Sequence, residues 1–79
     1  MTARVTVYTK PGCHLCEEAV EVVARVCADL GTSYREVDVT TDPDLHRRYA
    51  EQIPVTFVDG SQHDFWRVDE RRLRAALAG

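Results

Sequence analysis

The sequence predicts an α/β fold in which a four-stranded mixed sheet is flanked by three helices, in the order βαβαββα. Three observations predict it: valines at alternate positions in residues 4–8, a long apolar stripe at helical spacing in residues 13–30, and the pair Asp59-Gly60 between two short runs near the C-terminus. A strand, a helix and a strand in succession imply a right-handed crossover to a parallel neighbour. A two-residue turn makes its flanking strands antiparallel, so the sheet is expected to be mixed.

The first half of the chain has the pattern of a strand, a long helix and a second strand. After the first strand, residues 9–12 have the composition of a turn. The helix 13–30 is expected to press one stripe against the sheet, and Gly31 is expected to end it in a left-handed cap. Half-alternating apolar residues predict a strand over 33–39. The stripe comprises Cys16, Val20, Val23, Cys27 and Leu30, broadened by Ala19, Val22 and Val26.

The second half of the chain predicts a short helix, a hairpin and a final helix. Asp42 is the expected N-cap of the helix 43–50, which has a proline at its first position. Residues 53–58 and 61–66 are expected to form the third and fourth strands. Asp69 then caps the last helix, whose apolar positions are Leu73, Ala76 and Leu77.

Length and charge limit the classes of protein to consider. With 79 residues the chain is expected to be one domain, 1–79. Its net charge of −3 gives no electrostatic case for binding nucleic acid or an anionic membrane. No stretch approaches the roughly 18 to 20 apolar residues that span a bilayer, and three cysteines do not make a structural disulfide framework. We therefore expect a cytoplasmic monomer.

The most informative feature is the pair Cys13 and Cys16, placed where the first strand gives way to the long helix. Residues three apart on a helix share one face. The unpaired amide donors and the macrodipole of the first turn favour a thiolate there. A reactive thiol of low pKa is therefore predicted at Cys13, in preference to a buried structural thiol.

A zinc site is the first alternative for these cysteines. A closed tetrahedral site takes four ligands, usually as two close pairs. The second pair is missing from this sequence, and no metal is expected, because the remaining candidates lack ligand-like spacing: Cys27, His14, His46 and His63.

Two segments of the chain resemble a known family. Residues 8–16, Tyr-Thr-Lys-Pro-Gly-Cys-His-Leu-Cys, and residues 53–60, Ile-Pro-Val-Thr-Phe-Val-Asp-Gly, are similar to the glutaredoxin branch of the thioredoxin fold. The Cys-His-Leu-Cys centre, with the late Trp66 and Asp69, is similar to that of small bacterial glutaredoxin-like proteins. The resemblance covers nearly the whole chain and implies a thioredoxin-like fold.

The resemblance implies a thiol-disulfide oxidoreductase. Cys13 then attacks a disulfide to form a mixed disulfide, and Cys16 resolves it. The substrates are protein or low-molecular-weight disulfides. No bound cofactor is implied, and electrons come from glutathione, another small thiol or a flavoprotein reductase.

Four further site residues follow from the same resemblance. Lys10 precedes the active cysteine, where its ammonium lowers the thiol pKa and meets a substrate carboxylate, although a lone exposed lysine can also be inert. A protonated His14 favours the thiolate, unless this residue is only a solvated polar group. Pro54 matches a proline that follows a cis peptide bond, which leaves the backbone of Ile53 free to pair with an extended substrate.

The chain also departs from the family. Glutathione-binding glutaredoxins carry a Gly-Gly pair and an Asp after the hairpin, where this chain has Phe-Trp-Arg-Val-Asp at residues 65–69. N-cap duty is sufficient to explain Asp69. Trp66 either packs over the sheet or presents a flat apolar surface near the site. Two other functions stay open: a module in which two chains share a [2Fe-2S] cluster, and a redox-sensing interaction domain.

Overall fold

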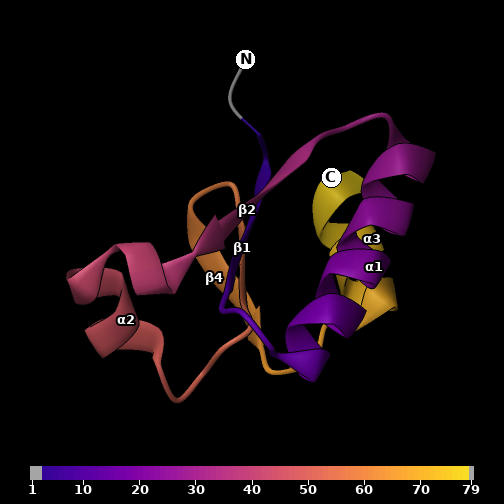
Figure 1. Cartoon of the computed structure of the whole chain (residues 1–79). Coiled ribbons are helices and arrows are strands. Elements are labelled where there is room, and N and C mark those ends of the chain that lie inside the picture. Colours follow the sequence, from indigo (N-terminus) through magenta and orange to yellow (C-terminus); the bar gives the residue numbers. More distant parts are fainter. Residues whose placement is uncertain (1–2, 79) are drawn as a thin grey trace.

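A four-stranded mixed sheet lies at the centre of the molecule, with α1 and α3 on one face and α2 on the other (Figure 1). The structure is a computed structural model and describes residues 3–78. It confirms the predicted α/β class and the order βαβαββα, with one short 3-10 helix added. The elements are β1 (Val5–Thr9), α1 (His14–Leu30), β2 (Tyr34–Asp38), η1 (Val39–Thr41), α2 (Pro43–Tyr49), β3 (Val55–Val58), β4 (Ser61–Phe65) and α3 (Glu70–Ala78).

The topology of the sheet brings two distant loops together. The strand order is β2-β1-β3-β4, with β1 parallel to β2 and antiparallel to β3. Val5 pairs with Val58 and Tyr8 pairs with Val55. The carboxyl end of β1 therefore lies beside the amino end of β3, and the loop before α1 lies next to the segment that precedes Val55.

Several element boundaries differ from the sequence prediction. The strand 33–39 ends at Asp38, because the carboxylate of Asp38 accepts a hydrogen bond from the Thr40 N–H at 2.8 Å and starts η1 there. The third strand starts at Val55 rather than at residue 53. The fourth strand ends at Phe65, because the backbone of Trp66 turns to a φ of +64°.

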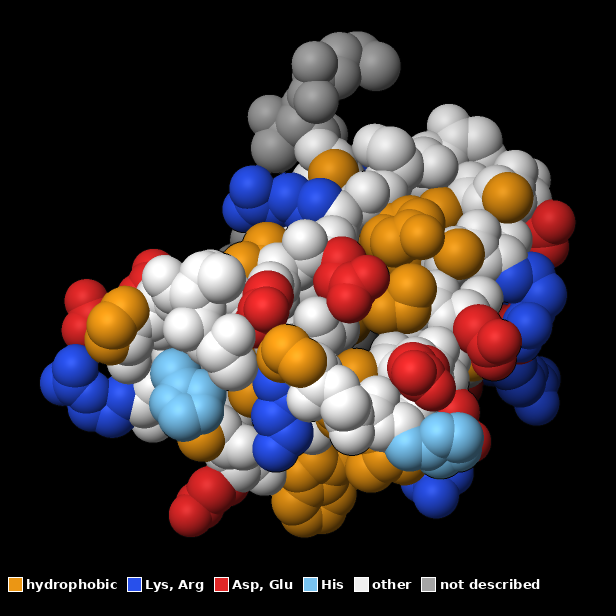
Figure 2. Space-filling view, viewed as in Figure 1, with side chains coloured by type: hydrophobic (Ala, Val, Ile, Leu, Met, Phe, Trp, Pro, Cys, Tyr) orange, Lys and Arg blue, Asp and Glu red, His pale blue; other side chains and the backbone are white. Residues whose placement is uncertain are grey.

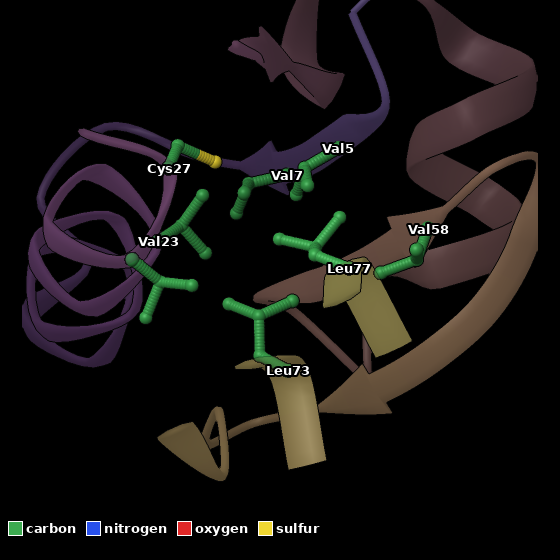
Figure 3. Close-up of a cluster of buried hydrophobic side chains, with 8 residues drawn as sticks. Val5, Val7, Val23, Cys27, Val58, Leu73 and Leu77 are labelled. Atoms are coloured by element: carbon green, nitrogen blue, oxygen red, sulfur yellow. The ribbon is translucent and has the colours of Figure 1, made fainter. Parts of the chain in front are cut away.

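The main core lies between the sheet and the helices α1 and α3 (Figure 3). The predicted stripe of α1 supplies part of it, and α3 contributes Leu73 and Leu77. The prediction that Leu30 belongs to the buried stripe was wrong, since this residue is 41% exposed. Leu30 is the last residue of α1 and lies beyond the buried Val26 and Cys27. The buried members are Val5, Val7, Val23, Val26, Cys27, Val58, Leu73 and Leu77.

Ion pairs on the surface join α1 to α3 through Glu70. Its carboxylate accepts hydrogen bonds from Arg25 and from Arg74, each at 2.8 Å. These two bonds lower the pKa of Glu70, and the bond from Arg25 has the larger effect. A carboxylate with a lowered folded-state pKa stabilises the fold above its unfolded pKa and loses this contribution as the pH falls through its folded pKa.

We expect the substitution Glu70→Gln to reduce stability at pH 7 and to matter less in acid. The difference in unfolding free energy between the wild type and the variant should start to shrink below about pH 4.3, the unfolded pKa of a glutamate. Urea unfolding at pH 7 and at pH 3 measures this difference. An equal difference at both pH values would show that the two ion pairs do not stabilise the fold.

Candidate functional site

The site begins with Cys13, which is the N-cap of α1 rather than the first helical residue predicted. The turn after β1 contains Gly12 at a φ of +72°, a conformation that glycine adopts without strain. Cys13 itself is extended, and its Sγ accepts a hydrogen bond from the Cys16 N–H at 3.1 Å. The sulfur thus takes the place of the oxygen that normally caps a helix. The same N–H and the helix dipole stabilise negative charge on Sγ when the thiol is reduced.

Cys13 and Cys16 are joined by a disulfide, with their Cα atoms 5.2 Å apart. This confirms that the two sulfurs lie within bonding reach. Cys16 is buried, whereas Cys13 is half-buried. Cys13 is therefore the more exposed residue of the pair, as the sequence predicts.

The peptide bond between Ile53 and Pro54 is cis, as the family resemblance implies. Ile53 packs with Cys16 in a second cluster of buried residues, and Cys13 lies against this cluster. Within residues 3–78, the backbone of Ile53 forms no hydrogen bond with another backbone group, either in the sheet or outside it. The pairing of this backbone with an extended substrate stays a prediction.

A hollow of about 380 Å³ opens between the start of α1 and the strand β2, next to the disulfide. Lys10 lines it together with the two carboxylates of Glu17 and Glu36. The Thr9 hydroxyl donates to Glu36 at 2.9 Å and holds that carboxylate at the end of β1. Lys10 and Cys13 thus line the same hollow, and the effect of Lys10 on the thiol stays a prediction.

The side chain of His14 lies on the exposed surface of α1. Its Nδ1 is 3.7 Å from a carboxylate oxygen of Glu17, and its Nε2 is 3.7 Å from one of Glu18. The imidazole therefore lies between two carboxylates of its own helix. Its influence on the Cys13 thiol stays a prediction.

Cys27 is the free cysteine of the described chain, and it lies in the core (Figure 3). Its side chain is buried between α1 and the sheet, and burial raises the pKa of its thiol. A thiol that stays protonated is a poor nucleophile. Cys27 is therefore a small core residue, as the sequence predicts.

Trp66 has a place that the strand pattern did not predict. Its backbone N–H donates to the carbonyl oxygen of the cis-proline Pro54 at 2.8 Å, and its indole N–H donates to that of Glu51 at 2.9 Å. The indole is nevertheless half exposed. Of the two alternatives given for Trp66, the exposed apolar surface is the one that the structure contains. Asp69 accepts a hydrogen bond from the Arg72 N–H at 3.1 Å, which confirms its N-cap duty on α3.

The described residues contain neither a candidate metal site nor a helix that could span a membrane. Among residues 3–78, no group of three or more His, Cys, Asp or Glu side chains is placed to hold a metal ion. In the same range, every helix is too short or too polar to cross a membrane.

The sheet order, the disulfide at the start of α1 and the adjacent cis-proline define a thioredoxin-fold protein with a Cys-x-x-Cys centre. A family model described as "Glutaredoxin-like domain (DUF836)" matches residues 4–78. The chain belongs to this glutaredoxin-like family.

Comparisons with individual proteins agree with this assignment. An uncharacterised protein of Mycobacterium tuberculosis is 35% identical in an alignment 80 positions long that covers 95% of this chain and 82% of that protein. The X-ray structure of a structural genomics target from X. campestris matches with a TM-score of 0.77 at 35% identity. The match covers 94% of this chain and 95% of the X. campestris chain. A thioredoxin of Fasciola hepatica has a TM-score of 0.62 at 20% identity, with 94% of this chain and 76% of that one covered, and shows the shared fold alone.

Proposed function

We propose that this protein is a thiol-disulfide oxidoreductase that reduces disulfides through Cys13 and Cys16. The observation that carries the proposal is the disulfide between the half-buried Cys13, whose sulfur caps α1, and the buried Cys16, next to a cis-proline loop. The glutaredoxin-like family supports a redox role for this arrangement.

The reaction proceeds in two exchanges. The Cys13 thiolate attacks one sulfur of the substrate disulfide, a Cys13–substrate disulfide forms, and the other substrate sulfur leaves as a thiolate that takes up a proton. The Cys16 thiolate then attacks Sγ of Cys13, which forms the internal disulfide and releases the second substrate thiol. Two electrons have passed to the substrate, and an external thiol pair returns them to Cys13 and Cys16.

The neighbouring residues have supporting roles in this proposal. The ammonium of Lys10 favours the Cys13 thiolate and attracts a carboxylate of a substrate or reductant. A protonated His14 adds positive charge at the start of the helix. The backbone of Ile53, presented by the cis bond to Pro54, pairs with an extended substrate. The electron donor is glutathione, another small thiol or a flavoprotein reductase, and the protein acts as a monomer in the cytoplasm.

The test supplies each class of reductant in turn and measures the rate at which a model disulfide is reduced. The reductants are dithiothreitol, glutathione with its reductase, and a thioredoxin-reductase-type flavoprotein with its nicotinamide donor. We expect turnover with at least one biological reductant. Failure of all three to reduce the Cys13–Cys16 disulfide would overturn the proposal. Visible absorbance of the purified protein that a chelator bleaches would favour the shared iron-sulfur cluster instead.

A further inference from the structure

Two exposed aromatic side chains stand together beside the site. In residues 3–78 the exposed large apolar side chains are those of Leu30, Phe65 and Trp66, with Trp66 at 53% and Phe65 at 47%. The rings of Phe65 and Trp66 meet edge to face with their centroids 5.0 Å apart. Figure 2 shows hydrophobic side chains gathered at the lower edge of the molecule, where the chain leaves β4 in Figure 1. Single exposed apolar residues are ordinary, but a contiguous pair attached to the cis-proline loop indicates a contact surface.

Trp66 is held in this exposed position at a cost. A φ of +64° is unfavourable for a residue with a Cβ. The hydrogen bonds to the carbonyls of Pro54 and Glu51 fix both the backbone and the indole. Backbone strain of this kind persists where the surroundings enforce it, and it is concentrated at functional sites. Trp66 is thus a rigid aromatic surface attached to the cis-proline loop.

The indole forms one wall of a groove of about 290 Å³ along α1. Leu15, which lies between the two cysteines in the sequence, also lines the groove, whereas the cysteines themselves line the hollow that contains Lys10. It lies on the other flank of α1 from the hollow that contains Lys10. The full lining is Leu15, Glu18, Ala19, Val22, Trp66, Arg67 and Val68.

The charge and size of the groove define its occupant. Its two charged lining residues, Glu18 and Arg67, have opposite signs, and the other five are apolar. An uncharged apolar group therefore fits better than an anionic thiol peptide such as glutathione. The volume of the groove is slightly smaller than that of small-molecule sites, which is about 300–1,000 Å³. It is large enough for a single side chain. The backbone of Ile53, which packs against Cys16, has no backbone hydrogen-bond partner among the described residues, and this favours an extended polypeptide as the source of that side chain.

We propose that the groove between Trp66 and α1 docks an uncharged apolar side chain of a protein substrate, close in sequence to the cysteine that Cys13 attacks. The inference rests on the proposed function and adds its substrate class: protein disulfides with an apolar neighbour are preferred over polar ones.

The test compares two disulfide-linked peptides that differ only in a leucine or a serine beside the cysteine. For the wild type we expect kcat/KM to favour the leucine peptide by about tenfold, the effect of burying one such side chain. The variant Trp66→Gly should lower this ratio to about twofold or less. Glycine adopts a positive φ freely and keeps the backbone N–H that donates to the carbonyl oxygen of Pro54. This hydrogen bond should therefore still hold the loop in the variant. Because the ratio is taken within one variant, a general change in activity cancels.

The matched control is Leu30→Ser, which removes the other exposed large apolar side chain, at the far end of α1. Its ratio should equal that of the wild type. A wild type that turns over both peptides equally, or a Trp66→Gly variant that keeps the wild-type ratio, would overturn the docking inference while leaving the proposed function intact. Loss of turnover with every disulfide would instead contradict the proposed function.

A second measurement keeps the test independent of the Trp66 variant. Trp66 is the single tryptophan of the chain, so its fluorescence reports on the groove alone. In a Cys16→Ser variant linked through Cys13 to the leucine peptide, emission should shift to shorter wavelength, and the serine peptide should cause a smaller shift. Identical spectra, or a shift that appears with protein concentration before peptide is added, would contradict docking of a peptide side chain. The latter result would identify a second copy of the chain as the occupant.

Discussion

Replacing Cys13 by serine is expected to abolish disulfide reduction, with kcat/KM lowered by at least about 10³-fold. A serine hydroxyl is a weak nucleophile at neutral pH without an adjacent base. Cys16 is buried, so it is poorly placed to take over the attack. The fold should not change, because serine caps a helix at least as well as the cysteine sulfur does. Steady-state reduction of a model disulfide with dithiothreitol measures the loss, and circular dichroism checks the fold.

The companion substitution Cys16→Ser should preserve the first exchange and stop at the second. The protein is then expected to accumulate as a Cys13 mixed disulfide, which intact mass spectrometry detects as the added mass of one substrate half. Cys27→Ser is the control for the number of cysteines, and it should retain turnover because Cys27 lies in the core. If the mixed disulfide forms on Cys16 in the Cys13→Ser variant instead, the roles of the two residues are reversed.

The features that sequence predicted correctly are those specified by neighbouring residues. The cysteine pair, the cap at Asp42 and the hairpin turn are each defined within a few positions, and the structure contains all three. The fold class follows from their order along the chain, because handedness and turn length leave few topologies. The cis bond before Pro54 required the family resemblance, since proline alone favours trans.

The features that sequence missed depend on contacts between distant segments. Trp66 continues the strand pattern, but hydrogen bonds to Glu51 and Pro54, more than ten residues away in the chain, turn its backbone out of the strand. Leu30 continues the apolar stripe of α1, but it is the residue at which the helix ends. Periodicity describes which residues share a face, and it does not say where the partner surface stops. The groove beside Trp66 was therefore beyond sequence reasoning.

Replacing Leu73 by alanine is expected to lower the unfolding free energy by about 2–5 kcal/mol. Leu73 is fully buried, and α3 inserts it into the cluster that also contains Val5 and Val7 (Figure 3). The deleted atoms lose their transfer free energy, and the cavity left in a close-packed core adds to the loss. Domains in general have only about 5–15 kcal/mol in total, so this variant should unfold at a much lower denaturant concentration. Urea unfolding followed by circular dichroism, with the disulfide intact, measures the change.

The control for this prediction is Leu30→Ala, the same chemical change at a leucine that is 41% exposed. Surface substitutions of this kind usually change stability by no more than about 0.5 kcal/mol, so the two variants should differ severalfold. Equal losses would mean that α3 does not contribute to the core as the structure shows. Because Leu73 lies outside the site, the folded fraction of Leu73→Ala should reduce a model disulfide at the wild-type rate. This separates the stability supplied by α3 from the chemistry supplied by the start of α1.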